Sequence, residues 1–311
     1  MYLKGYILAV FIILLFLIPL MIRDIYTLHI LNMIGIYILL VSGLNLVMGY
    51  AGQVHIGQAG FYAIGAYTSA LLALNLKLSF WLALPAAGVV AGIFGLLVGP
   101  VSRLPPYALA MATIAFGEIV YVVALNWVGL TRGASGLLNI PPPRIGSFTF
   151  SSDRSFYYLI LISVLGNYFI IGRLIRSRVG RALRAIRDNE RAALASGIHV
   201  ARYKTVAFAL AALFAGIAGS LYAHLTGFIS PYGFDLNESL KIFTMMVIGG
   251  SGSIFGPILG VAALTVAPEY LRGFQEYNLL LYGFVLLLVL MFAPEGLDGL
   301  VSWLRRRLAP I

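Results

Sequence analysis

Apolar runs long enough to cross a membrane recur along nearly the whole chain, and this pattern limits the fold more than any other feature. A helix needs about 20 apolar residues to cross a hydrocarbon core of roughly 30 Å. Of the 311 residues, 61% are hydrophobic and 10% are charged, against roughly 45–50% and 25% in soluble domains. The sequence therefore predicts an all-α, polytopic membrane protein that forms a single transmembrane domain over residues 1–311.

About ten segments are expected to be embedded in the membrane. Six precede the middle of the chain, at residues 6–22, 28–48, 56–74, 80–98, 107–128 and 156–175. The first follows Lys4 like a signal peptide, but it lacks a small-x-small cleavage site, so we interpret it as a span. The others are residues 206–225, 240–250, 254–271 and 279–292.

Basic residues predict the orientation of the chain. The segment from Arg173 to Lys204 holds nine of the 21 Lys and Arg residues, and three more are Arg305, Arg306 and Arg307. Both segments are expected in the cytoplasm, because positively charged loops stay on that side. Two cytoplasmic segments need an even number of crossings between them. Residues 240–271 are therefore expected to form a hairpin or a re-entrant pair that starts and ends outside, which leaves both termini in the cytoplasm.

The residues offer no cluster for catalysis or for a metal ion. Cysteine is absent, which excludes thiolate chemistry, and the four histidines lie far apart in sequence: His29, His55, His199 and His224. The net charge of +10 comes from short basic segments between apolar runs rather than from a basic face interleaved with aromatics. We therefore predict a non-catalytic protein that contacts lipid, binds no nucleic acid and holds no cofactor of its own.

Small residues recur four apart in several predicted spans. They are Gly88 and Gly92, Gly95 and Gly99, Gly216 and Ser220, and the series Gly252, Gly256 and Gly260. This spacing lets helix backbones approach closely in lipid. The last series follows Gly249, Gly250 and Ser251, where unpaired backbone groups are tolerated at membrane depth only inside protein or along a wet cavity. The stretch Gly249 to Gly252 is therefore a candidate border of a translocation path.

Polar residues within the apolar runs are further candidates for the path. Glu118 lies near the middle of the predicted span 107–128, where a charge costs about 2.5 to 3.5 kcal/mol on insertion scales. It is either functional or a structural carboxyl group bonded to Asn126 or to another helix. Gln53 and Gln58 lie at the glycine-rich start of the run 56–74, which suggests a broken helix or a tightly packed interface.

The basic segment of about residues 176–203 carries the strongest pattern. Four arginines three or four apart form one helical stripe, and small apolar residues form another part of the surface: Arg181, Arg184, Arg187 and Arg191, then Ala182, Ala185, Ile186 and Ala193. Asp188 or Asn189 can cap a second short helix, and Gly197 before Ile198 fits a helix C-cap. The alanine-rich face suits a protein groove, and a basic helix resting on anionic lipid is the alternative.

Four blocks of sequence carry a resemblance to a known family. They are GLNLVMGYAGQVHIGQAGFYAIGAYTSALL near the start, LTRGASGL at 130–137, GRALRAIRDNERAALASGI at 180–198 and VIGGSGSIFGPILGVAAL at 247–264. In these blocks the chain resembles the permease subunits of ATP-binding-cassette (ABC) importers for branched-chain amino acids. The resemblance is to the larger of the two permeases in particular.

The resemblance implies partners and a contact site. The partners are a sister permease, two ATP-binding subunits that bind ATP and Mg themselves, and an extracytoplasmic substrate-binding protein that delivers Leu, Ile or Val. The implied location is a prokaryotic plasma (inner) membrane. The matching loop is the family's contact with the ATPase, which points here to Gly180, Arg181, Arg184, Arg187, Asp188, Asn189, Glu190 and Gly197.

Two departures from the family pattern leave alternatives open. His55 stands where the family often has a small polar residue, and Arg132 replaces a commonly small one. Related permeases for urea, short amides or other amino acids share much of the pattern.

The main rival is a secondary transporter driven by an ion gradient, with Glu118 as coupling carboxylate and residues 247–257 as ion site. A membrane-embedded enzyme is a more distant alternative.

Overall fold

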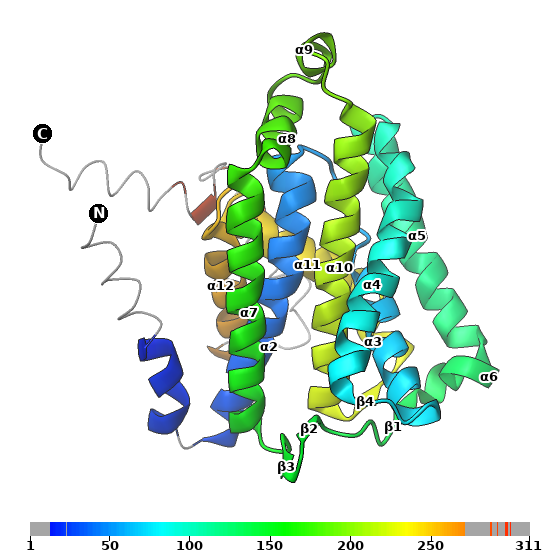
Figure 1. The fold of residues 1–311 in the computed structure, drawn as a ribbon, viewed down its shortest axis with the longest axis vertical. Helices are drawn as coiled ribbons and strands as arrows, with labels where there is room; N and C mark the ends of the chain where they lie inside the picture. The colour runs from blue at the N-terminus through cyan, green and yellow to red at the C-terminus, as the bar shows by residue number, and fades with distance from the viewer. Residues whose placement is uncertain are drawn as a thin grey trace, which may run out of the picture.

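The computed structural model describes residues 13–22 and 24–270 and the isolated positions 287, 291, 296, 297 and 299. Its long helices stand side by side in a bundle (Figure 1): α2 (Ile25–Asn45), α3 (Gln58–Asn75), α4 (Phe80–Val98), α5 (Pro106–Asn126), α7 (Asp153–Arg176) and α10 (Val200–Thr226). Residues 13–21 are also helical. Most of the predicted span 279–292 and the arginines at 305–307 lie outside the described residues.

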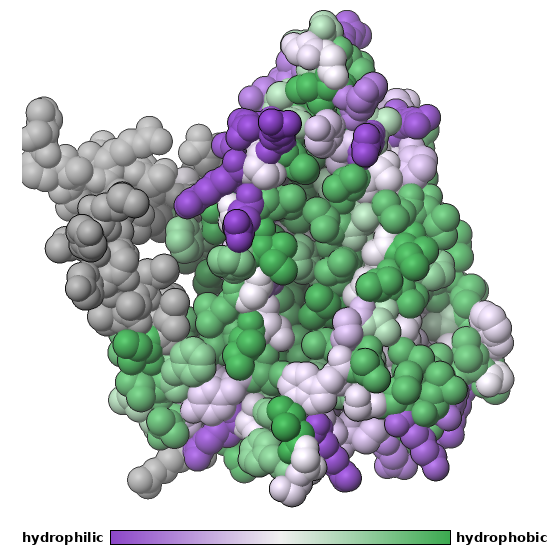
Figure 2. All heavy atoms as spheres, in the orientation of Figure 1, coloured by the Kyte–Doolittle hydropathy of each residue, from purple (hydrophilic) through white to green (hydrophobic). Residues whose placement is uncertain are grey.

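Five described helical stretches are long and apolar enough to cross a membrane: Ile25–Tyr50, Phe80–Arg103, Pro106–Asn126, Asp153–Arg176 and Val200–Thr226. Each was predicted as a span. The first and second include the short segments η1 (Leu46–Tyr50), which is π-helical, and η2 (Gly99–Arg103), a 3-10 helix. Figure 2 shows an apolar band across the middle of the visible face, with hydrophilic side chains gathered at the two ends of the molecule. This distribution fits a protein that spans a bilayer.

Glycine contacts hold the centre of the bundle together. A Cβ atom added to Gly65 of α3 would lie 2.3 Å from the Cα of Gly216 on α10, and one on Gly95 of α4 would lie 2.6 Å from the Cβ of Ala212. Gly216 in turn backs onto Ala87 of α4. The packing predicted for these small residues is confirmed, because α3, α4 and α10 approach closely where side chains are missing.

The two ends of the bundle differ in structure. At one end, uppermost in Figure 1, lie α8 (Arg178–Asp188) and α9 (Glu190–Ala195), which we call the α8–α9 end. The other end, the strand end, carries α6 (Val128–Thr131), η3 (Gly133–Ser135) and four two-residue strands. These are β1 (Leu137–Leu138) paired antiparallel with β4 (Phe228–Ile229), and β2 (Arg144–Ile145) paired with β3 (Phe148–Thr149). The sequence did not predict the strands, which satisfy backbone groups in long connections.

The predicted hairpin at residues 240–271 is confirmed as α11 (Leu236–Gly249) and α12 (Gly256–Tyr270). Gly249 backs onto Gly256 and Gly260 across the pair. Helix α11 follows η4 (Pro231–Phe234) and starts beside the middle of α2, where Tyr37 bonds to Glu238. The sequence predicted the start of this pair at its outer end, whereas in the structure the first turn of α11 lies beside the middle of α2.

Candidate functional site

The two caps of α9 match the sequence prediction. The Asn189 side chain accepts a hydrogen bond from the Ala192 N–H at 3.0 Å, so Asn189 rather than Asp188 caps α9. Gly197 has φ +79°. The Gly197 N–H donates to Leu194 O, and the Ile198 N–H donates to Ala193 O, each at 3.0 Å. These two bonds form a Schellman motif, which confirms the predicted C-cap.

The apolar face of α8 packs against its own chain. Leu183 joins a buried cluster with Tyr50, Leu109 and Phe208, and Ile186 packs with Ala193 and Val200. The sequence predicted that this face suits a protein groove, and the bundle itself provides that groove for the buried residues Ala182, Leu183 and Ile186.

The arginine stripe is divided between internal bonds and free surface. The Arg184 guanidinium donates to Ile175 O at 3.1 Å, and the Arg181 guanidinium donates to Arg176 O at 3.2 Å. Both bonds fasten α8 to the end of α7. Gly180 lets the two helices meet, since a Cβ there would lie 2.3 Å from Ile175 O. Arg191 on α9 is exposed and makes no side-chain bond within the described part of the chain.

A buried lysine links α9 to the membrane helices. Lys204 has 4% of its side chain exposed, and its Nζ donates to Glu190 Oε2 at 2.8 Å and to Ser102 O at 3.4 Å. Gln53 completes the group: its amide nitrogen lies 2.9 Å from Ser102 O and its amide oxygen 3.1 Å from Lys204 Nζ. Gln53 was a candidate for the path, and the structure places it in this network beside Glu190.

The glycine-rich turn at residues 250–253 is where the predicted ATPase-contact loop meets the predicted border of the translocation path. Asn45 clamps the turn, since its Nδ2 donates to Ser253 O at 2.6 Å and its Oδ1 accepts from the Gly252 N–H at 2.9 Å. The Arg187 Nη1 donates to Gly49 O and lies against Gly252. Gly252 has φ +82° and no room for a Cβ beside Arg187. The arginine of α8 therefore touches both η1 and the α11–α12 turn.

The remaining path candidates lie apart from that turn. Gln58 is fully buried, and its Nε2 donates to Leu40 O at 3.3 Å and to Ala211 O at 3.4 Å. Glu118 is half-buried on α5 and makes no hydrogen bond or ion pair within the described ranges. The suggested bond to Asn126 is wrong, because the Asn126 amide donates to Val122 O in its own helix.

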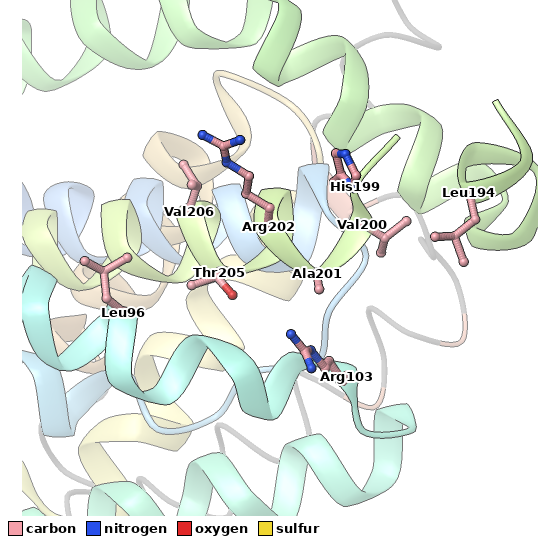
Figure 3. A pocket seen from close by; sticks show the side chains of 9 residues that line it. All are labelled: Leu96, Arg103, Leu194, His199, Val200, Ala201, Arg202, Thr205 and Val206. Carbon is pink, nitrogen blue, oxygen red and sulfur yellow. The ribbon is translucent and has the colours of Figure 1, made fainter. Parts of the chain in front are cut away.

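A basic cavity of about 700 Å³ opens beside α9 (Figure 3). Its lining includes Leu194, His199, Arg202 and Arg103, and Figure 3 shows Arg103 extending from η2 toward α10. None of the lining residues is acidic. Leu194 is 55% exposed at the edge of this cavity. The α8–α9 end therefore presents an accessible apolar side chain next to several basic groups.

Sequence reasoning missed a cluster at half depth. Tyr37, Glu238 and Lys241 bond to one another between α2 and α11. Tyr37 sits inside an apolar run and gives no signal, and Glu238 and Lys241 lie at the start of the predicted pair at residues 240–271. The opposite charges of Glu238 and Lys241, three residues apart, were the one sequence signal for this cluster.

No group of His, Asp and Glu among the described residues could hold a metal ion. Within those residues, the polar clusters hold helices and turns in place.

Comparison with known proteins identifies relatives over most of the chain. Residues 26–292 match the family described as "Branched-chain amino acid transport system / permease component". The chain is 41% identical to the high-affinity branched-chain amino acid transport system permease protein LivM of Salmonella typhimurium, over 86% of this chain and 68% of the relative. Identity to LivM of Escherichia coli K12 is 40%, over 87% and 69%. The permease protein LivH of Salmonella typhimurium is 29% identical, over 85% and 91%. No solved structure matches.

Proposed function

Because this chain belongs to the permease family of branched-chain amino acid transport systems, we propose that it moves leucine, isoleucine and valine into the cytoplasm with energy from partner ATPases. It is a non-catalytic permease component of an ABC transport system, akin to LivM. The high identity to LivM over most of this chain supports that substrate class over urea or short amides.

The proposed assembly contains this chain, a sister permease of the LivH type, two ATP-binding subunits and an extracytoplasmic substrate-binding protein. The whole chain forms one transmembrane domain with about ten membrane-embedded segments in a prokaryotic plasma membrane. Both termini and the α8–α9 end face the cytoplasm, and the strand end faces outward. The excess of basic residues around α8 and α9 supports this orientation.

The contact of Arg187 with both η1 and the α11–α12 turn carries the proposed coupling mechanism. An ATPase that pushes on α9 moves α8, because Asn189 joins the two helices without a spacer. Helix α8 is fastened to α7 by Arg184, and Arg187 passes its displacement to the ends of α2 and α11. Movement at the α8–α9 end thus reaches the helices that form the transport path.

The exposed residues of this end are the proposed ATPase contact. Leu194 offers an apolar anchor at the cavity that Arg103 and Arg202 line, and Arg191 is exposed three residues earlier on α9. Glu190 and Asn189 act by holding α9 in place. This assignment differs from the sequence-based one, since the internal bonds of Arg181, Arg184 and Arg187 make them positioning residues.

Reconstituted vesicles test the proposal directly. Co-expressed subunits should purify as one complex, and leucine uptake should need ATP and the binding protein and continue after ionophores collapse the ion gradients. Arg191→Glu should weaken binding of the ATPase subunits about tenfold, by loss of one charged contact. The matched control Arg144→Glu, at the strand end, should leave that binding unchanged. Uptake that stops with the gradient while ATP remains would favour the ion-coupled rival that uses Glu118.

A further inference from the structure

A mixed-charge cluster lies at the centre of the membrane span. Tyr37 is the residue midway along the span Ile25–Tyr50, about 18 Å from the Ile25 end at 1.5 Å per residue. Its hydroxyl donates to Glu238 Oε1 at 2.6 Å. The first turn of α3 lies at the same level, because the Ala59 N–H donates to Ser239 Oγ at 3.2 Å, beside Glu238. Helices α3 and α11 therefore both begin inside the bundle, at the level of Tyr37.

The cluster faces something other than lipid. The Glu238 side chain is 16% exposed and that of Lys241 is 25% exposed. The neighbouring Asn237 is exposed. Charged groups at this depth are found against protein or a water-filled cavity, because lipid cannot solvate them. This side of α11 must therefore line water or the partner permease in the assembled transporter.

The charges of the cluster retain unused binding capacity. The Lys241 Nζ donates to the Tyr37 hydroxyl at 2.6 Å and lies 3.6 Å from Glu238 Oε2. An ammonium group has three N–H donors, and a carboxylate has about four acceptor positions. Tyr37 thus holds the two charged groups side by side. Lys241 keeps N–H donors and Glu238 keeps acceptor positions for a ligand.

Aromatic residues adjoin the charged groups. The ring centroids of Tyr62 and Phe234 are 5.0 Å apart, and those of Tyr62 and Tyr222 are 5.5 Å apart. Tyr222 is partly exposed, and its ring centroid lies 6.0 Å from that of Phe234, which precedes Glu238 by four residues. A paired negative and positive group beside aromatic surface matches the parts of an amino acid with an apolar side chain.

We propose that Glu238 and Lys241 bind the α-ammonium and α-carboxylate groups of the amino acid in transit, with its side chain toward Tyr222. Tyr37 is a positioning residue that holds both groups. The site rests on the proposed transport of branched-chain amino acids and refines it, because a site of two opposite charges recognises a zwitterion and disfavours neutral urea or amides. Helix α11 connects this site to the turn that Arg187 contacts.

Cysteine protection tests the site in the assembled complex, and the cysteine-free chain makes the experiment clean. A cysteine at Asn237 should react with a charged, water-soluble thiol reagent. A matched cysteine at Ile162, which is 59% exposed on α7 and expected to face lipid, should stay unreactive. Saturating L-leucine should slow the reaction of the Asn237→Cys variant about tenfold, which corresponds to a free-energy difference of about 1.4 kcal/mol. 4-Methylpentanoate, isoamylamine and urea each lack one or both charges, so they should not slow the labelling reaction.

A second variant separates binding from folding. In Asn237→Cys/Glu238→Gln, labelling without leucine should stay within about twofold, and protection by leucine should disappear. Protection that persists in this variant, equal protection by the singly charged analogues, or an inert Asn237→Cys would overturn the site. ATP-driven uptake by the wild-type complex is measured separately, so the site can fail while the proposed function stands. Loss of ATP dependence would instead remove the proposed function.

Discussion

Single residues at the α8–α9 end gain their roles from backbone geometry and burial rather than from net charge. Gly197 ends α9 with a positive φ, and a Cβ there would meet no atom within 4 Å. Lys204 is buried among oxygen atoms, while its partner Glu190 keeps 49% of its side chain exposed. The sequence predicted the cap at Gly197 from local spacing. It did not predict the Lys204 network, because Gln53 and Ser102 are far away in the chain.

Substitution of Gly197 tests the cap without steric interference. Gly197→Val should destabilise the end of α9 by about 1–2 kcal/mol, since a β-branched residue resists positive φ. Gly197→Asn should cost much less, because Asn tolerates this conformation. ATPase-subunit affinity and hydrogen exchange over residues 190–198 should report the loss. Equal behaviour of the Val and Asn variants would show that the cap does not hold the contact surface in place.

The Lys204 and Glu190 pair predicts an asymmetric response. Glu190→Gln leaves a buried positive charge without its anionic partner, whereas Lys204→Met removes the charge and lets Glu190 turn to water. We expect Glu190→Gln to lower the melting temperature of the purified permease more than Lys204→Met, because an uncompensated buried charge is costly. The partial exposure of Glu190 reduces the expected difference to about 1–2 kcal/mol. A larger loss in Lys204→Met would mean that the hydrogen bonds of the ammonium group to Ser102 O and Gln53, rather than its pairing with Glu190, dominate the stability of the site.

At the scale of elements, periodicity predicted most helices and missed the points where they begin at half depth. The predicted bounds of α4 coincide with the observed Phe80–Val98, because an uninterrupted apolar run leaves little choice. Helix α3 starts at Gln58, two residues after the predicted start, and follows a non-helical segment at residues 52–57, where the sequence suggested a broken helix or a tight interface but did not reveal the depth. Polar side chains bury there against distant backbone, as Gln58 does with Ala211 O, and local sequence does not reveal such partners.

Helix packing can be tested with two glycines of unlike surroundings. Gly65→Ala would drive a Cβ into the backbone of Gly216, so the contact between α3 and α10 must open. Gly166 on α7 has no heavy atom within 4 Å of the added Cβ. We expect Gly166→Ala to be neutral or to stabilise by about 0.5–1 kcal/mol, through helix propensity, and Gly65→Ala to destabilise by about 1–3 kcal/mol, through overpacking. Thermal unfolding in detergent would compare them. A stable Gly65→Ala protein would contradict the close approach.

At the scale of the whole molecule, contacts connect one end of the bundle to its centre. Arg187 joins α8 to η1 and to the α11–α12 turn, and α2 and α11 lead from there to Tyr37 and Glu238. Both connected helices therefore have one end beside Arg187 and carry the proposed substrate contact midway along the span Ile25–Tyr50. A rigid pair of helices can change the access of that site when the α8–α9 end moves. This scheme requires the two ends of the bundle to face opposite sides of the membrane.

Cysteine labelling of intact cells tests that orientation. Ser196 lies at the end of α9 and Ser135 lies in η3 at the strand end, and both are exposed. In the cysteine-free chain, Ser135→Cys should react with an impermeant thiol reagent in intact cells, whereas Ser196→Cys should react only after the membrane is opened. The expectation follows from the basic residues around α8 and α9, which keep that end in the cytoplasm. Labelling of both cysteines in intact cells would place the two ends on one side. The α8–α9 end could not then meet a cytoplasmic ATPase, and the path from Arg187 to Glu238 would lose its source of movement.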